Sequence, residues 1–114
     1  MLEAAKKAFG VLTLARKAGK LVLGFDAVKE TLQNRTAKLA VITSDVSPKT
    51  EKEVRFYCTR ACVDIISVPL SMDEVSKLLG KKSGVISVTD GGLAELIKKK
   101  YNEYRTSMED NKWQ

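Results

Sequence analysis

A glycine between a short apolar run and an amphipathic segment is the feature of this sequence best suited to binding a ligand. Gly24 follows the apolar residues 21–23 and precedes a segment of helical periodicity. The first amides of a helix have no acceptor within the helix and lie at the positive end of its dipole, so they can bind an anion or a base-edge oxygen. Glycine permits that close approach. We therefore predict an anion site at Gly24, with Lys20 and Lys29 as nearby cations.

A second basic segment with a glycine occurs at residues 81–86. Its lysines could neutralise phosphates and its apolar residues could pack against an unstacked base, two contacts that RNA recognition often combines. A solvated loop could have the same composition as residues 81–86, and an ordinary strand-to-helix turn could have the same sequence as the Gly24 segment. On these residues alone, a structural role and an RNA-binding role both stay open. Loops at the same end of a doubly wound sheet can lie together and form one surface. The residues concerned are Lys81, Lys82, Ser83, Gly84, Val85 and Ile86.

The composition argues against an enzyme. The chain has no histidine, and histidine is the commonest general base and zinc ligand. The Gly24 turn lacks the lysine–serine ending of a P-loop and the three glycines of a dinucleotide site. We therefore expect no catalytic residue, no cofactor, no metal site and no small-molecule substrate. Cys58 and Cys62 are four residues apart, and we expect both to be reduced core residues on one helix face.

Length and charge limit the class of protein further. A chain of 114 residues can form one domain with a proper core. Its 20 Lys and Arg residues against 14 Asp and Glu residues give a formal net charge of +6, which favours a polyanionic partner. No apolar run approaches the roughly 20 residues that cross a bilayer, and the first residues lack the pattern of a signal peptide. We expect a cytoplasmic protein without a membrane partner.

Predicted strands and helices alternate along the chain. Apolar runs predict strands near residues 21–23, 38–43, 63–68 and 85–89, and helical periodicity predicts helices at 2–17, 25–32, 48–62, 72–79 and 93–104. Ser47 and Ser71 are the expected N-caps of two of these helices. The pattern predicts an α/β fold: a single-domain, three-layer α/β/α sandwich with a small mixed sheet of about four strands. We assign the domain to residues 1–105 and a polar C-terminal tail to 106–114, which is either frayed or a terminal extension.

Three segments of the chain resemble the kink-turn RNA-binding family of ribosomal proteins L-seven-Ae and L-thirty-e, and more narrowly its bacterial YlxQ-type members. They are residues 23–32, 37–48 and 79–89, and the resemblance covers roughly residues 5–100. It implies an α/β/α sandwich that binds a kink-turn, a bent RNA element whose sheared G·A pairs are read by the helix beginning at the glycine. In such proteins the later loop covers the extruded nucleotide with apolar side chains.

The same resemblance implies roles for individual positions. Gly24 matches the glycine of the family and Phe25 follows it. Asp26 stands where asparagine is frequent, Ala27 where glutamate is frequent, and Glu30 where lysine is usual. An ionised aspartate only accepts hydrogen bonds, so Asp26 could bind a guanine N1 or N2 donor but could not donate to O6. These departures bear on kink-turn specificity more than on RNA binding itself.

These observations predict a non-catalytic, monomeric RNA-binding protein whose partner is kink-turn or similar structured RNA, with ribosomal RNA as one candidate. A different class of function stays open: a protein-interaction module of the same fold that has lost kink-turn recognition. Similar folds also occur as accessory domains of RNA methyltransferases, but we expect no catalysis from this one domain. The predicted RNA-binding residues are Lys20, Gly24, Phe25, Asp26, Lys29, Lys81, Lys82, Ser83, Gly84, Val85 and Ile86.

Overall fold

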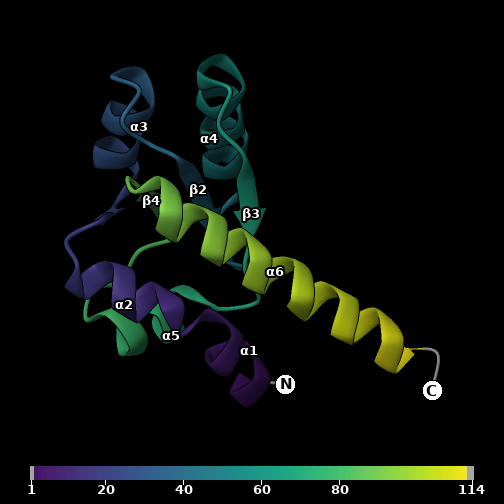
Figure 1. The fold of residues 1–114 in the computed structure, drawn as a ribbon. Coiled ribbons are helices and arrows are strands. Elements are labelled where there is room, and N and C mark those ends of the chain that lie inside the picture. Colours follow the sequence, from purple (N-terminus) through teal and green to yellow (C-terminus); the bar gives the residue numbers. More distant parts are fainter. Residues whose placement is uncertain (1, 113–114) are drawn as a thin grey trace.

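Helices and strands alternate along the chain, as the sequence pattern predicts. The structure is a computed structural model and describes residues 2–112. The helices in this part are α1 (Leu2–Phe9), α2 (Val11–Lys17), α3 (Phe25–Gln33), α4 (Pro48–Ala61), α5 (Met72–Leu79) and α6 (Gly91–Lys112) (Figure 1). The strands are β1 (Leu21–Leu23), β2 (Leu39–Ile42), β3 (Ile65–Ser67) and β4 (Val85–Val88).

The four strands form one mixed sheet in the order β1-β4-β2-β3. β2 and β3 are parallel, whereas β4 lies between β1 and β2 and is antiparallel to both. The ends of β1, β2 and β3 therefore meet the beginning of β4 at one edge of the sheet. The loops that follow the first three strands and the loop that precedes the fourth are brought together there.

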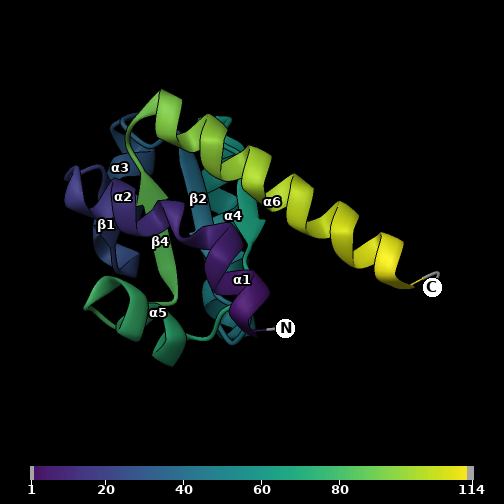
Figure 2. The ribbon, with the colours of Figure 1, turned by 60° about the horizontal axis from the view of Figure 1, so that its bottom comes forward.

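Helices cover both faces of this sheet, so the expected three-layer α/β/α sandwich is confirmed (Figure 2). Alternate strand residues point to opposite faces. Leu39 and Val41 pack with α1, α2, α5 and α6, while Ala40 and Ile42 pack with α3 and α4. The sheet is therefore buried on both sides, as its nearly continuous apolar strands require.

The N-terminal segment differs from the prediction, because one expected helix is two. α1 ends at Phe9 and α2 begins at Val11, with Gly10 between them. Glycine has little helix propensity, so the chain can change direction there. The break lets α1 pack along α6. The centre of the Phe9 ring lies 6.4 Å from that of the Tyr101 ring and 5.7 Å from that of the Tyr104 ring. α2 meanwhile contacts α5 and α6.

In the C-terminal segment α6 continues to Lys112, so the described part of the predicted tail is a helical extension and is not frayed. No proline or further glycine follows Gly92, so nothing in the sequence ends the helix. Its far half extends past the rest of the molecule, which explains its polar character (Figure 2). The end of the expected tail, Trp113 and Gln114, lies outside the described residues. The domain boundary at residue 105 stays a prediction.

Local signals correctly marked the beginnings of two helices and misplaced one cysteine. The Ser47 hydroxyl accepts from the Thr50 amide, and Ser71 forms a capping box with Glu74. Cys58 is 2% exposed in the core, and its burial raises the pKa of the thiol to about 11. Cys62 is exposed, although both cysteines were expected in the core. It lies at the end of α4 with a left-handed φ of 57°, so it leaves the helix face that Cys58 occupies.

Candidate nucleic-acid interface

Three helix N-termini and one basic loop surround a groove at one end of the sheet. α3 begins directly after β1, α4 follows β2, and α5 follows β3, while residues 80–84 lead into β4. The groove holds about 360 Å³. Its walls are formed by Gly24, Phe25, Val46, Ser47, Thr50, Met72, Lys82, Ser83, Gly84 and Val85. The structure therefore brings together the two segments that the sequence singled out.

The Ser83 hydroxyl joins these two segments. Gly24 donates its amide to the Val85 carbonyl at 3.0 Å and to Ser83 Oγ at 3.1 Å. Ser83 Oγ donates in turn to the Val85 carbonyl at 2.7 Å and accepts from the Val85 amide at 3.2 Å. The Gly24 carbonyl is thus free to accept from the Val28 amide at 2.9 Å, the first bond of α3. One buried hydroxyl fixes the position of the loop relative to the start of the helix.

The N-terminus of α3 is the open one among the three around the groove. Gly24 has φ 105° and ψ 144°, a conformation suited to glycine, and no side chain caps this helix. Ser47 and Ser71, by contrast, cap α4 and α5. The first-turn amides of α3 therefore have no side-chain acceptor among the described residues and point their partial positive charge at the groove.

The cations predicted for the site are arranged differently from one another. Lys82 lines the groove, and its ammonium lies 3.0 Å from an Asp73 carboxylate oxygen on the exposed surface. Lys81 is exposed beside it. Lys29 points along the molecule toward α4, where its ammonium lies 5.0 Å from the centre of the Tyr57 ring. The exposed ion pair between Lys82 and Asp73 is weak, so Lys82 can turn toward a phosphate at little cost.

Lys20 lies away from this group. Its carbonyl accepts from the Thr89 amide at 2.9 Å, so it lies at the opposite end of β1 and β4 from Gly24. At about 3.3 Å per strand residue, four residues separate the two by roughly 13 Å. Adjacency in the sequence suggested a shared site, but the extended strand between them places Lys20 at the other edge of the sheet.

Of the apolar residues that the sequence indicated, Val85 and Ile86 are buried and Phe25 is not. Val85 is 3% exposed and Ile86 is 0% exposed, so neither side chain can cover a base. Phe25 is half-buried and lines the groove, as predicted, together with half-buried Val46 and Met72. Gly84 lets Met72 lie against the loop, because a Cβ at this glycine would be only 3.1 Å from the Met72 sulfur.

Sequence reasoning missed Val46 and Met72, and only weak signals could have found them. Val46 precedes the N-cap Ser47, and Met72 follows the N-cap Ser71. Apolar residues beside caps commonly pack against their own helix. The order of the strands, which the sequence does not reveal, is what brings these two side chains to Gly24.

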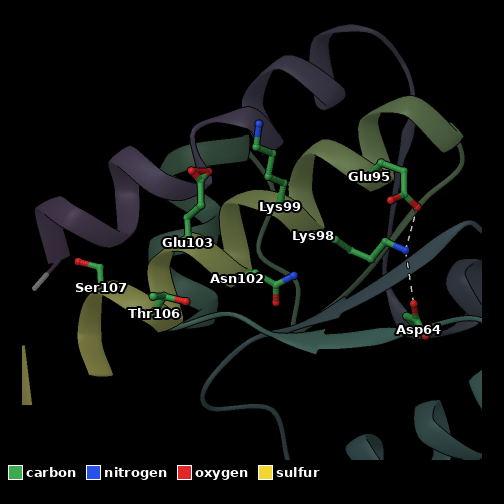
Figure 3. Close-up of a pocket in the computed structure, with 8 residues that line it drawn as sticks. All are labelled: Asp64, Glu95, Lys98, Lys99, Asn102, Glu103, Thr106 and Ser107. Carbon is green, nitrogen blue, oxygen red and sulfur yellow. Dashed lines mark hydrogen bonds and ion pairs between the residues drawn. The ribbon is translucent and has the colours of Figure 1, made fainter. Parts of the chain in front are cut away.

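A larger hollow of about 980 Å³ lies along α6, and none of its lining residues belongs to the Gly24 groove (Figure 3). Its floor is occupied by Lys98, whose ammonium lies 2.9 Å from Glu95 and 3.4 Å from Asp64. The hydrogen bond to Glu95 raises the pKa of Lys98, so this amine is a charged partner rather than a base. In the described part of the chain no three His, Cys, Asp or Glu residues form a metal-binding group, and no helix is long and apolar enough to span a membrane.

Comparison with known proteins adds independent findings. Residues 6–97 match the model of the "Ribosomal protein L7Ae/L30e/S12e/Gadd45 family". The RNA-binding protein YlxQ of Bacillus subtilis (strain 168) is 36% identical over 94 residues, which cover 78% of this chain and 89% of that protein. The RNA-binding protein YlxQ of Enterococcus faecium is 29% identical over 96 residues, with 82% and 89% covered. A solved structure of a protein with unknown function from Bacillus halodurans C superposes with a TM-score of 0.78 at 25% identity, covering 84% of this chain and 97% of that one.

Proposed function

The chain belongs to the ribosomal protein L7Ae/L30e/S12e/Gadd45 family, and from that premise we propose that it is a non-catalytic, cytoplasmic, monomeric RNA-binding protein. It holds a kink-turn or similarly bent RNA at the Gly24 groove. The observation that carries this proposal is the open N-terminus of α3, fixed against the basic loop 80–84 by Ser83. The family match spans both segments, and two relatives are named as RNA-binding proteins.

In the proposed complex the first turn of α3 reads the RNA. Its amides bind a phosphate or a base-edge oxygen, for which their uncapped and positively polarised ends are suited. Asp26 lies exposed in this turn and accepts hydrogen bonds from the N1 and N2 groups of a guanine. A sheared G·A pair offers such a guanine, so this contact supports a preference for a kink-turn over a plain duplex.

The loop and its neighbours hold the rest of the RNA element. Lys82 and Lys81 neutralise phosphates at the mouth of the groove, and Lys29 neutralises one further along α3. Phe25 and Met72 provide an apolar wall against which an extruded base packs. Ser83, Gly84 and the buried residues that follow keep this loop at the helix N-terminus.

The proposal is tested by comparing three RNAs at moderate salt: a kink-turn, the same RNA with its G·A pairs disrupted, and a plain duplex. Wild-type protein binds the kink-turn most tightly. The double variant Lys29→Ala, Lys82→Ala binds it roughly ten-fold more weakly, which is about 1.4 kcal/mol. Because two phosphate contacts are lost, the slope of log affinity against log salt becomes shallower by about 1.5 to 2.

A matched control removes the same charge from the other face of the sheet. Lys7 of α1 and Lys99 of α6 are exposed on that side, and the double variant Lys7→Ala, Lys99→Ala keeps the wild-type affinity and most of the salt slope. Equal losses in the two double variants would refute a contact at the groove and leave only an effect of net charge.

A protein-interaction module remains the competing function, and Asp26 and Glu30 are the observation that favours it. Both are exposed acidic residues on α3, the helix proposed to face RNA. Equal wild-type affinity for all three RNAs would contradict kink-turn recognition and support this second function, since a phosphate-rich ligand would then be bound by charge alone.

A further inference from the structure

A second groove lies between α3 and α4, at the opposite end of these helices from Gly24. It holds about 360 Å³, within the range of about 300–1,000 Å³ typical of small-ligand sites. We call it the α3–α4 groove, and its walls include Gln33, Arg35, Phe56, Tyr57 and Arg60. Neither the sequence pattern nor the proposed kink-turn contact assigns a role to these residues.

An exposed aromatic side chain dominates this groove. Phe56 is 55% exposed, whereas most large apolar side chains of the described core are buried. Its ring meets that of Tyr57 edge to face, with centroids 5.2 Å apart and planes at 84°. Tyr57 is half-buried and packs beneath α3, so it holds Phe56 outward on a rigid helix. Rigid exposed aromatic rings are the platforms on which single-stranded bases stack.

Two guanidinium groups accompany this ring. The Arg60 guanidinium lies 5.6 Å from the centre of the Phe56 ring. Arg35 lies just past the end of α3 with φ 64°, a left-handed conformation that is uncommon for residues other than glycine. The Asn34 side chain holds this turn by accepting from the Thr36 amide at 3.1 Å and its hydroxyl at 2.6 Å. The strained position of Arg35 is therefore fixed by its neighbours, as at many ligand-binding sites.

The charges of the groove favour a phosphate-bearing occupant. Neither Arg35 nor Arg60 forms a salt bridge with any carboxylate among residues 5–108, whose side chains the structure describes. Guanidinium groups bind phosphate in a bidentate manner and also stack on bases. The two cations outweigh the partial negative charge at the ends of α3 and α4. An aromatic platform beside two unpaired guanidinium groups matches the two chemical parts of a nucleotide.

The groove also lies on a continuous path from the Gly24 site. α3 has nine residues and a length of about 13 Å, and its two ends carry the two sites. Lys29 lies between them, with its ammonium over the Tyr57 ring. A strand that leaves the Gly24 groove along the seam of α3 and α4 would meet this lysine and then Phe56.

We propose that the α3–α4 groove binds an unpaired nucleotide of a single-stranded RNA segment, with the base stacked on Phe56 and its phosphates held by Arg35 and Arg60. The inference rests on the proposed RNA-binding function but concerns a separate surface. It therefore extends the contact beyond the folded RNA element to the single strand that flanks it.

The test uses the full chain and three probes: a labelled oligouridine of about eight nucleotides, an abasic strand of equal length, and an untailed kink-turn. Wild-type protein binds oligouridine more tightly than the abasic strand. The variant Phe56→Ala loses this preference, with a decrease of about ten-fold in oligouridine affinity, while Phe56→Trp retains it. The double variant Arg35→Gln, Arg60→Gln weakens the binding of both strands.

Three outcomes decide the matter. A loss of base preference in Phe56→Ala, with unchanged kink-turn affinity, supports the inference, and it does so even if the kink-turn is bound no better than a duplex. Kink-turn binding without any preference for oligouridine over the abasic strand overturns the inference and leaves the proposed function intact. Equal oligouridine affinity for wild type and Phe56→Ala also overturns it, because the Phe56 ring then contributes no base stacking. Thermal melting confirms that each variant is folded.

Discussion

The link between Ser83 and Gly24 gives the sharpest quantitative prediction. In the β1–β4 register Gly24 lies opposite Val85, one step beyond the pair Leu23–Ile86. The Gly24 carbonyl has turned to accept from Val28, so the Val85 amide bonds to Ser83 Oγ instead. In Ser83→Ala the Gly24 amide keeps the Val85 carbonyl, but the Val85 amide is left buried without an acceptor. An unsatisfied buried amide costs about 1–3 kcal/mol.

Urea denaturation measures this loss as a decrease in the free energy of unfolding. Each kcal/mol lost lowers Tm by about 4 °C. Ser76→Ala is the control, because Ser76 lies in α5 and its hydroxyl forms no hydrogen bond with any residue that the structure describes. We expect that control to stay within about 0.5 kcal/mol of wild type. A decrease in Ser83→Ala no larger than in the control would refute the idea that this hydroxyl supports the loop.

The same variant separates stability from RNA binding. If Ser83 holds the loop against the start of α3, its loss moves Lys82 and Gly84 relative to the open amides of this helix. Affinity for the kink-turn therefore falls at temperatures where Ser83→Ala is still fully folded. Unchanged affinity in the folded variant would show that the loop finds its position without this hydroxyl.

Of three further predictions, two concern the Cys58 thiol and one concerns the acidic side chain of Glu30. Burial raises the pKa of Cys58 to about 11 from the ordinary value of 9.0. At pH 8 a thiol reagent therefore labels exposed Cys62 and spares Cys58 until the protein unfolds. Mass spectrometry of the labelled peptides measures this difference. Because the raised pKa belongs to the folded state, the contribution of Cys58 to stability is fully present below pH 9.0 and decreases between pH 9.0 and about 11. Urea titrations show a smaller loss of stability over this pH range in Cys58→Ala than in wild type. Glu30→Lys replaces a repulsive charge on α3 by an attractive one, so RNA affinity rises and the slope of log affinity against log salt steepens by about 1. The control Glu103→Lys on α6 leaves RNA affinity near wild type. Equal effects of the two variants would show that net charge alone is responsible.

Much of the fold followed from local sequence signals. Apolar runs predicted the strands, and Ser47 and Ser71 correctly marked the beginnings of α4 and α5. These signals act within a few residues, because a cap bonds to its own helix and successive strand residues point to alternate faces of the sheet. The same locality explains the failures at Gly10 and Cys62. Whether a glycine breaks a helix, or a cysteine leaves the helix face, depends on what the next element must pack against.

The order of residues along the chain specifies the alternating α/β architecture, the basic charge, the glycine that opens α3 and the cationic loop before β4. Which of these parts lie together depends on how the elements pack. The strand order β1-β4-β2-β3 brings the loop to Gly24 and buries Ile86 where a base contact was expected. The physical reason is that spacing along the chain sets periodicity and capping, whereas strand order and register are fixed by burying both faces of the sheet at once.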